Sequence, residues 1–165
     1  MAELTQDRLK ELFDYNEDTG DLIRRVRTNG RVRVGEVAGS KNVRGYLQTQ
    51  IDGKKYYAHR LIWFIVNGTW PQKHIDHING IKNDNRISNL RDVSCGENSR
   101  NLGKRCSNKS GFIGVYFSKQ REKWVAQIRV NGIAKHLGLF KCKLRAVWEY
   151  NKAKIKYGYH PNHGR

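Results

Sequence analysis

Acid, imidazole and amide side chains crowd into one short segment of this chain. His74, Asp76 and His77 open the segment, and Asn89 and Asn98 follow farther along the sequence. An imidazole can take a proton from water near neutral pH, and carboxylate and amide oxygens are ligands that Mg²⁺ prefers. Hydrolysis of a phosphodiester needs an activated water and a cation that stabilises the developing charge. The segment therefore predicts a site that cuts phosphodiesters.

The spacing of the two central residues poses a geometric problem. Asp76 and His77 are adjacent, so in an extended strand their side chains point to opposite sides. A local kink or a second element of the fold must therefore bring both side chains to one centre.

The charge of the chain is high and unevenly placed. The 165 residues carry a formal net charge of +17. Residues 101–165 hold 15 Lys and Arg against 2 Asp and Glu, whereas residues 1–100 hold 17 against 13. Nucleic acid is the expected partner of such a surface, because each neutralised phosphate releases counterions. A highly soluble or ribosome-associated basic protein is the alternative explanation of the charge.

Compartment and redox state are predicted from what the sequence lacks. It has no apolar run of about 18 residues, so we expect no membrane span. Its first residues lack the pattern of a secretory signal, which predicts a cytoplasmic protein. Cys95, Cys106 and Cys142 contain no Cys-x-x-Cys pair, so we expect buried or half-buried thiols.

Several segments of the first hundred residues carry local structural signals. Asp52-Gly53 between two alternating runs predicts a hairpin with a tight turn, and Asn67-Gly68 ends a predicted buried helix. The other expected elements are a helix over 5–13, a turn over 14–21, strands over 22–26 and 31–37, an extended stretch over 75–78, and a helix that begins near Ser94.

Four motifs in order resemble the HNH endonucleases, in particular the branch found in phages and introns. They are His59-Arg60-Leu61, Asp76-His77, the run from Asp84 to Leu90, and Glu97-Asn98. The resemblance covers roughly residues 10–101. It implies a ββα-metal motif, in which a hairpin and a helix surround one divalent ion, Mg²⁺ or Mn²⁺.

The resemblance also implies a role for each matching residue. His77 is similar to the general base that deprotonates water, and Asp76 and Asn98 to the metal ligands. Asn89 is similar to the residue that hydrogen-bonds the His77 ring and orients it. The expected products carry 5′-phosphate and 3′-hydroxyl ends.

Alternative readings stay open for the neighbouring residues. His74 is a strand or surface residue, or it assists the scissile phosphate, and His59 is a structural hydrogen-bonder. Asn83 and Asn85 shape the loop. Arg86 and Arg91 contact phosphate or form ion pairs with Asp84 or Asp92. A zinc site of His74, His77 and Cys95 has irregular spacing and weak support.

A second set of alternating segments fills the basic C-terminal part. We expect strands over 111–117, 123–130 and 133–140, with Asn131-Gly132 as a tight turn, and a helix over 143–158. Strand alternation places Trp124, Ala126, Ile128 and Val130 on one face, where we expect them to pack on the helical stripe Leu144, Val147, Trp148 and Ile155.

This part resembles the DNA-binding domain of plant ethylene-response factors (AP2/ERF), a three-stranded antiparallel sheet backed by one helix. The motif from Ser110 to Tyr150 carries the resemblance, although Tyr116 and Ser118 replace the expected arginines of the first strand. Arg129 can contact guanine or phosphate, and Gln127 can contact adenine. The predicted DNA-binding residues are Tyr116, Lys119, Arg121, Gln127, Arg129, Lys135 and His136. A basic sheet with generic phosphate affinity is the alternative.

Together these features predict an α+β protein with two domains. A ββα-metal nuclease domain spans 1–101, a linker 102–110, and a three-stranded antiparallel sheet packed on one helix 111–165. The predicted function is that of a free-standing phage homing endonuclease, a monomer or homodimer that nicks or cleaves double-stranded DNA with Mg²⁺ or Mn²⁺. A non-cleaving DNA-binding regulator with the same architecture is the alternative.

Overall fold

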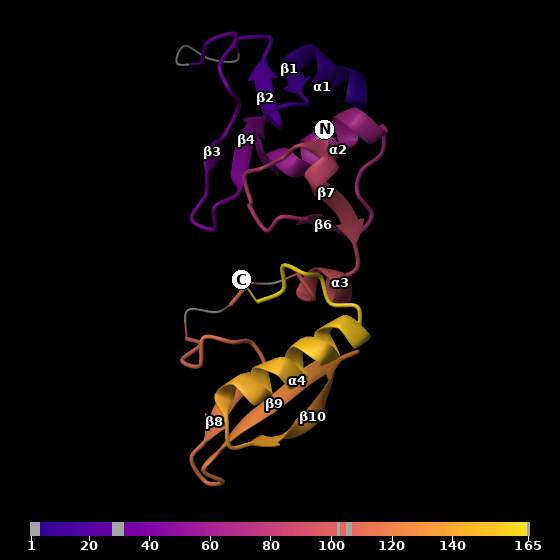
Figure 1. Ribbon diagram of the computed structural model, residues 1–165. Helices are drawn as coiled ribbons and strands as arrows, with labels where there is room; N and C mark the ends of the chain where they lie inside the picture. Colours follow the sequence, from indigo (N-terminus) through magenta and orange to yellow (C-terminus); the bar gives the residue numbers. More distant parts are fainter. Residues whose placement is uncertain (1–3, 28–31, 102, 105–106, 165) are drawn as a thin grey trace. The chain divides into compact units, whose positions relative to one another are not determined.

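The computed structural model describes residues 4–27, 32–101, 103–104 and 107–164. Contacts between Cα atoms divide the chain into two compact units, Met1–Cys95 and Gly96–Arg165. Short helices and small antiparallel sheets occur in both units, which confirms the predicted α+β class (Figure 1). The predicted domain limits at 101 and 111 stay predictions, and each unit is described by itself below.

The first unit begins with a helix and a hairpin. Helix α1 (Gln6–Leu12) is capped by Thr5, whose hydroxyl accepts a hydrogen bond from the backbone N–H of Arg8 at 3.2 Å. Strands β1 (Phe13–Asn16) and β2 (Asp21–Arg24) then pair antiparallel. The predicted turn over 14–21 was therefore too long. The Asn16 side chain accepts two backbone N–H bonds, and Gly20 adopts φ 80°, so four residues complete the reversal.

A three-stranded sheet follows, made of β3 (Ser40–Lys41), β4 (Leu47–Ile51) and β5 (Lys54–Tyr57). Asp52 and Gly53 both have positive φ, at 47° and 81°, which confirms the tight turn. The strand predicted over 31–37 is wrong for residues 32–37, and Arg31 lies outside the described residues. Gly35 turns the chain with φ 85°, and Val37 forms an isolated bridge to Ile23.

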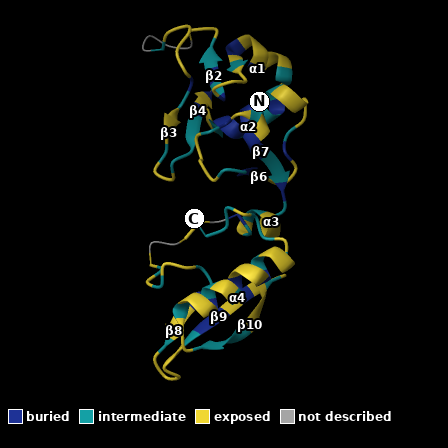
Figure 2. Ribbon diagram, viewed as in Figure 1, coloured by how far each residue is buried: buried dark blue, intermediate teal, exposed yellow. Residues whose placement is uncertain are grey.

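Helix α2 (Ala58–Asn67) ends at Gly68, which takes φ 72° and donates its N–H to the carbonyl of Phe64. The predicted buried helix is thus confirmed. Its Leu61 and Ile62 are fully buried, as Figure 2 shows by the dark blue in α2. The core of the unit also includes Leu9, Leu12, Phe13, Leu22, Ala38, Ile51, Ala58, Phe64, Ile75 and Leu90.

The polar motif lies on a hairpin with a long connection. Strand β6 (His74–His77) pairs antiparallel with β7 (Leu90–Val93), and the connecting loop ends in a 3-10 turn, η1 (Ile87–Asn89). Helix α3 (Cys95–Ser99) follows, which confirms the helix expected near Ser94. The division between the two units falls at the first turn of this helix.

The second unit contains the predicted sheet and helix. Strands β8 (Val115–Ser118), β9 (Lys123–Val130) and β10 (Ile133–Phe140) form an antiparallel sheet in the order β10-β9-β8, with helix α4 (Lys143–Lys156) against it (Figure 1). Strand β8 starts four residues later than expected. At Gly114, with φ 70°, a Cβ atom would come within 2.4 Å of the Gln127 carbonyl oxygen.

The predicted apolar stripe of α4 was wrong for three of its four residues, whereas Val147 packs against the core as expected. Leu144, Trp148 and Ile155 are exposed, by 70%, 48% and 83% of their surface. The helix instead buries Ala146, Tyr150 and Ala153, which pack with Ala126 and Ile128 of the sheet. Small residues allow the helix backbone to approach the sheet closely. The exposed Trp148 ring is flanked by Arg145, at 4.3 Å, and by Lys152, at 3.8 Å.

Two predictions from composition can also be compared with the structure. Within the described part of the chain, no helix has both the length and the apolar character needed to cross a membrane. Cys95 and Cys142 are exposed, so their expected burial was wrong, and Cys106 lies outside the described residues.

Candidate active site

The β6–β7 hairpin gives Asp76 and His77 different partners. Asp76 is paired in register with Arg91, and His77 with Leu90. Both polar side chains are buried, with 8% of Asp76 and 4% of His77 exposed. As the alternation of a strand requires, the carboxylate and the imidazole are held by different neighbours. The loop and α2 contact His77 and β7 contacts Asp76, and the convergence of the two side chains on one centre stays a prediction.

The imidazole of His77 contacts an amide and two rings. Its Nε2 lies 3.0 Å from Oδ1 of Asn85, and its ring centroid lies 5.2 Å from that of His59 and 5.9 Å from that of Tyr46. Burial lowers the pKa of His77, because the charged ring loses hydration, while the Asn85 hydrogen bond and the Asp76 charge oppose this shift. The ring is therefore neutral near pH 7, which is the form that a general base requires.

His59 supports His77 as a second buried ring. It lies at the start of α2, packs edge-on against His77, and stacks on Tyr57 at 5.2 Å. Burial lowers its pKa to about 3, with further contributions from His77 and Arg60. Its Nδ1 has no hydrogen-bond partner among the described residues. His59 was expected to be a structural hydrogen-bonder, whereas its contacts with Tyr57 and His77 are ring packing.

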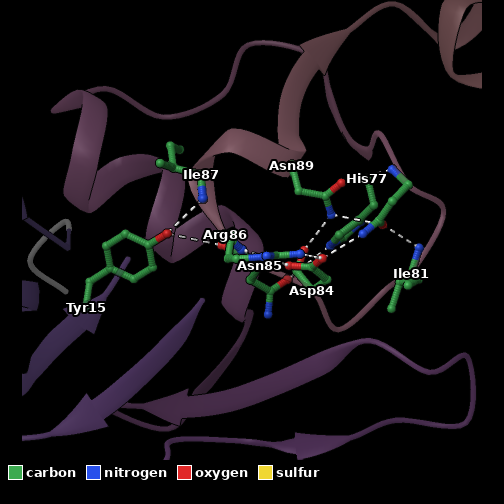
Figure 3. A network of polar contacts seen from close by, with 9 residues as sticks. Tyr15, His77, Ile81, Asp84, Asn85, Arg86, Ile87 and Asn89 are labelled. Atoms are coloured by element: carbon green, nitrogen blue, oxygen red, sulfur yellow. Dashed lines mark hydrogen bonds and ion pairs between the residues drawn. The ribbon is translucent and has the colours of Figure 1, made fainter. Parts of the chain in front are cut away.

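The loop before η1 is held by a network of side chains (Figure 3). The Asn89 amide nitrogen donates to Oδ1 of Asn79 at 3.0 Å and to the carbonyl of Asp84 at 2.8 Å, and its oxygen accepts from the Asn79 N–H. Asp84 forms an ion pair with Arg86 at 2.6 Å. That hydrogen-bonded pair lowers the pKa of Asp84 to about 2.

The family resemblance assigned the orientation of the His77 ring to Asn89, and the structure shows a contact of this ring with Asn85. The bonds given above for Asn89 fix the loop, whereas the contact at Nε2 of the His77 ring comes from Asn85. The expected hydrogen bond between Asn89 and the ring stays a prediction. Asn85 is 1% exposed, so its backbone and side chain are both enclosed by the fold.

The carboxylate of Asp76 is held by an arginine from the neighbouring strand. Arg91 donates from Nε at 3.0 Å and from Nη2 at 2.7 Å, both to Oδ2 of Asp76. The ion-pair alternative for Arg91 was therefore correct, but its partner is Asp76 and not Asp92. Asp92 instead accepts the backbone N–H groups of Gln72 and Lys73 at 2.8 and 2.9 Å.

The predicted metal ligands belong to different units. Asp76 lies on β6 in the first unit, and the half-buried Asn98 lies on α3 in the second. Their shared role stays a prediction. Among residues 4–27, 32–101, 103–104 and 107–164, no three His, Cys, Asp or Glu side chains gather as a metal site. The zinc alternative from His74, His77 and Cys95 has no support there.

Comparison with known proteins agrees with this geometry. Residues 56–100, from β5 to the residue after α3, match the HNH endonuclease family. This part of the chain is an HNH endonuclease domain. The match includes Asp76, His77, Asn89 and Asn98, together with Asn85 and Arg91.

A relative from a phage also matches the chain. Protein 3.8 of Escherichia phage T7 is 37% identical over 75 residues, which are 45% of this chain and 62% of that relative. The matched part is thus less than two thirds of the relative's own length. No solved structure is similar enough to count as a match.

Outside the HNH domain, the predicted DNA-binding residues of the second unit are all exposed. Gln127 and Arg129 alternate with the buried Ala126 and Ile128 of β9, so they lie on the sheet face opposite α4. His136 is paired in register with Gln127, which places it on the same face, and Tyr116 shares this face through its pairing with Val125. Lys119 and Arg121 lie in the turn between β8 and β9.

Two residues of this sheet depart from the exposed face opposite α4: Lys135 lies on its other side, and Val125 is buried. Lys135 is paired with Ile128 and its Nζ lies 5.0 Å from the Tyr157 ring, so it lies on the helix side of the sheet. Val125, which alternation places on the same face as Gln127, is only 4% exposed between its cross-strand neighbours Tyr116 and Leu139. The face opposite α4 therefore combines a small apolar centre with polar and basic side chains.

Sequence reasoning missed the partners of Asp76 and His77. Asn85 was expected to shape the loop, and its contact with His77 had no spacing signal. The pairing of Arg91 with Asp76 depends on the β6–β7 register, which becomes predictable once both strands are assigned. A strand assignment for Leu90–Val93 would have identified this pair.

Proposed function

We propose that this protein is a metal-dependent HNH endonuclease that nicks or cleaves double-stranded DNA. The observation that carries the proposal is the buried imidazole of His77, next in sequence to the buried carboxylate of Asp76, within residues that match the HNH endonuclease family. In this proposal His77 takes the proton from the attacking water. The buried ring packing of His59 and Tyr46 and the contact from Asn85 restrict how the imidazole can turn.

The proposal assigns the divalent cation to Asp76 and Asn98. One carboxylate oxygen and one carboxamide oxygen are hard donors, which suit Mg²⁺ or Mn²⁺ and fit no soft metal. When bound, the cation would supply positive charge for the phosphoanion and the leaving oxygen. The chain's own part is to present the Asp76 carboxylate, which Arg91 holds through two hydrogen bonds.

The second unit is proposed to supply much of the DNA affinity. Residues 101–165 carry a net charge of +13, and the sheet face opposite α4 presents Gln127, Arg129 and His136 without burial. Lys119 and Arg121 project from the adjacent turn, where they can meet phosphates. Lys135, on the helix side of the edge strand β10, fits phosphate contact better than base contact. The resemblance to ethylene-response factors supports this assignment.

The biological role we propose is that of a free-standing phage homing endonuclease, which acts in the cytoplasm of the host cell as a monomer or homodimer. The similarity to Protein 3.8 of Escherichia phage T7 supports a phage setting. One HNH site cuts one strand at a time, so a double-strand break requires a second subunit or a second binding event.

The test is a nicking assay on supercoiled plasmid with Mg²⁺. The wild-type protein should relax the plasmid, and His77→Ala should lower the rate by roughly 10²- to 10⁴-fold, the usual contribution of a general base. Asn83→Ala, at an exposed residue of the same loop, serves as the matched control and should act like wild type.

Two outcomes would contradict the proposal. Equal relaxation by wild type and His77→Ala would remove the assigned base, and cutting that persists in EDTA would remove the metal roles of Asp76 and Asn98. Tight DNA binding without cutting by either protein would favour the DNA-binding regulator.

A further inference from the structure

The β1–β2 hairpin contacts three consecutive residues, Asn85 to Ile87, at the end of the loop that connects β6 to η1. The Tyr15 hydroxyl accepts the backbone N–H of Ile87 at 2.8 Å and donates to the carbonyl of Asn85 at 3.4 Å (Figure 3). Gly20, at the end of the hairpin turn, lies so close that a Cβ atom there would come within 2.4 Å of the Arg86 nitrogen. The backbone from Asn85 to Ile87 is therefore fixed by residues about 70 positions earlier in the chain.

This segment carries the amide that meets the catalytic ring. Asn85 is almost fully buried, and its Oδ1 lies 3.0 Å from Nε2 of His77. The Asn85 side chain has only two rotatable bonds, so it has few alternative positions when it is buried and its backbone is held by the hairpin. The position of the hairpin is thus transmitted to the imidazole through one buried amide.

The contact also bears on which ring nitrogen holds the proton. A carbonyl oxygen can only accept, so Oδ1 of Asn85 favours the tautomer with the proton on Nε2, which directs the lone pair to Nδ1. If the amide were turned over, its nitrogen would donate to Nε2 and favour the opposite tautomer. In the structure Oδ1 of Asn85 faces Nε2, and Nδ2 has no hydrogen-bond partner among the described residues, so the assignment of the tautomer rests on this one contact.

We propose that Tyr15 and Asn85 are positioning residues for the general base, and that the β1–β2 hairpin keeps the His77 ring in its Nε2-protonated tautomer. The inference rests on the proposed role of His77. It extends the active site beyond residues 56–100, because Tyr15 and Gly20 lie outside the part that matches the HNH family.

The first test measures the tautomer directly in the full-length protein. Nitrogen-15 NMR of labelled histidine at pH 8, with His77→Ala for assignment, should show His77 with its proton on Nε2. Asn85→Leu keeps the size of the side chain but removes the acceptor, and the ring should then show a mixture of tautomers. Asn85→Asp keeps an acceptor and lacks a donor, so it should preserve the wild-type tautomer.

The second test measures nicking under single-turnover conditions, together with DNA affinity. Tyr15→Phe should slow nicking by roughly 3- to 10-fold, the worth of one or two hydrogen bonds, with unchanged affinity. The matched control is Tyr56→Phe, at a half-buried tyrosine of the same unit that stacks on Trp70. It should change nicking by less than about twofold, since a stacked ring keeps its contact without the hydroxyl.

These readouts separate the positioning role from the proposed function. A wild-type ring protonated on Nδ1, or tautomers unchanged in Asn85→Leu, would overturn the inference even if the plasmid is cut. Equal nicking rates for Tyr15→Phe and Tyr56→Phe would also overturn it. If His77→Ala cuts like wild type, the proposed function fails, whereas the NMR measurement still decides whether the hairpin positions the ring.

Discussion

The two units of this protein hold their polar side chains in opposite ways. In the first unit, Asp76, His77, Asn85 and Asn89 are buried, and each forms a hydrogen bond with a neighbouring residue. In the second unit, the side chains proposed to meet DNA, such as Gln127 and Arg129, are exposed on a regular sheet. A base must be fixed and partly dehydrated, whereas a surface for a polyanion must be accessible. Substitutions in the first unit should therefore change rate and stability, and those in the second should change affinity and its salt dependence.

The largest effect is expected at Asp76. Asp76→Asn keeps the size of the side chain but removes the charge that holds the proposed cation, so nicking should slow by on the order of 10²- to 10³-fold. DNA affinity should change little, which a fluorescence anisotropy titration can check. Asp92→Asn on the same hairpin is the matched control, because Asp92 binds backbone N–H groups of Gln72 and Lys73. Equal losses in both variants would show that only the hairpin fold matters.

Arg91 should matter for stability and for its response to metal. Arg91→Ala leaves the buried Asp76 carboxylate without this ion pair, which should lower the free energy of unfolding by about 2–4 kcal/mol. Added Mg²⁺ should recover part of that loss, because the cation replaces the missing positive charge. Urea unfolding with and without Mg²⁺ measures both effects.

Arg86→Ala is the control for Arg91, because Arg86 is more exposed and pairs with Asp84 outside the proposed metal site. Its loss should be smaller and should not respond to Mg²⁺. Equal recovery of both variants by Mg²⁺ would contradict a cation at Asp76.

The pH dependence of stability should come largely from His59. Its pKa is lowered to about 3 in the folded protein, against an ordinary value of 6.5, so below pH 6.5 the unfolded chain binds a proton that the folded chain does not. Stability should fall as the pH drops from 6.5 toward 3, by up to about 1.4 kcal/mol per pH unit for this group. His59→Phe should flatten the slope of unfolding free energy against pH by one proton, and an unchanged slope would show that His59 is not the group responsible.

The smallest effect is expected in the second unit. Arg129→Ala should weaken DNA binding by roughly 5- to 10-fold and should leave the free energy of unfolding unchanged. If Arg129 contacts phosphate, the slope of log affinity against log salt should become shallower by about 0.9. Lys55→Ala, at an exposed lysine of β5, is the control and should alter the salt slope less. A large loss of stability in Arg129→Ala would break the contrast between the units.

Local signals predicted much of the fold because they act over a few residues. Asp52-Gly53 and Asn131-Gly132 adopt positive φ as expected, and β9 and β10 have the predicted limits. Two local predictions were wrong, because the Asn16 side chain shortened the turn over 14–21 and Gly35 turns the chain within residues 32–37. Contacts between distant segments left no such local signal.

The candidate site shows the same division. The residue types that can do the chemistry, Asp76 and His77, are evident from the chain alone. Their partners are not, because Tyr15 and Asn85 are 70 residues apart and meet only when the hairpin packs on the loop. In α4, apolar residues occur on more than one side of the helix, and the close approach of Tyr150 to Gly114 selected the side with small residues.

The sequence by itself determined the local turns, the caps and the identity of the reactive groups, because backbone preferences and side-chain chemistry are properties of a few neighbouring residues. Only the tertiary structure decided which amide meets the His77 ring, which arginine pairs with Asp76 and which side of α4 is buried. Those outcomes depend on strand register and on the packing of distant segments, where a shift of one residue exchanges every partner.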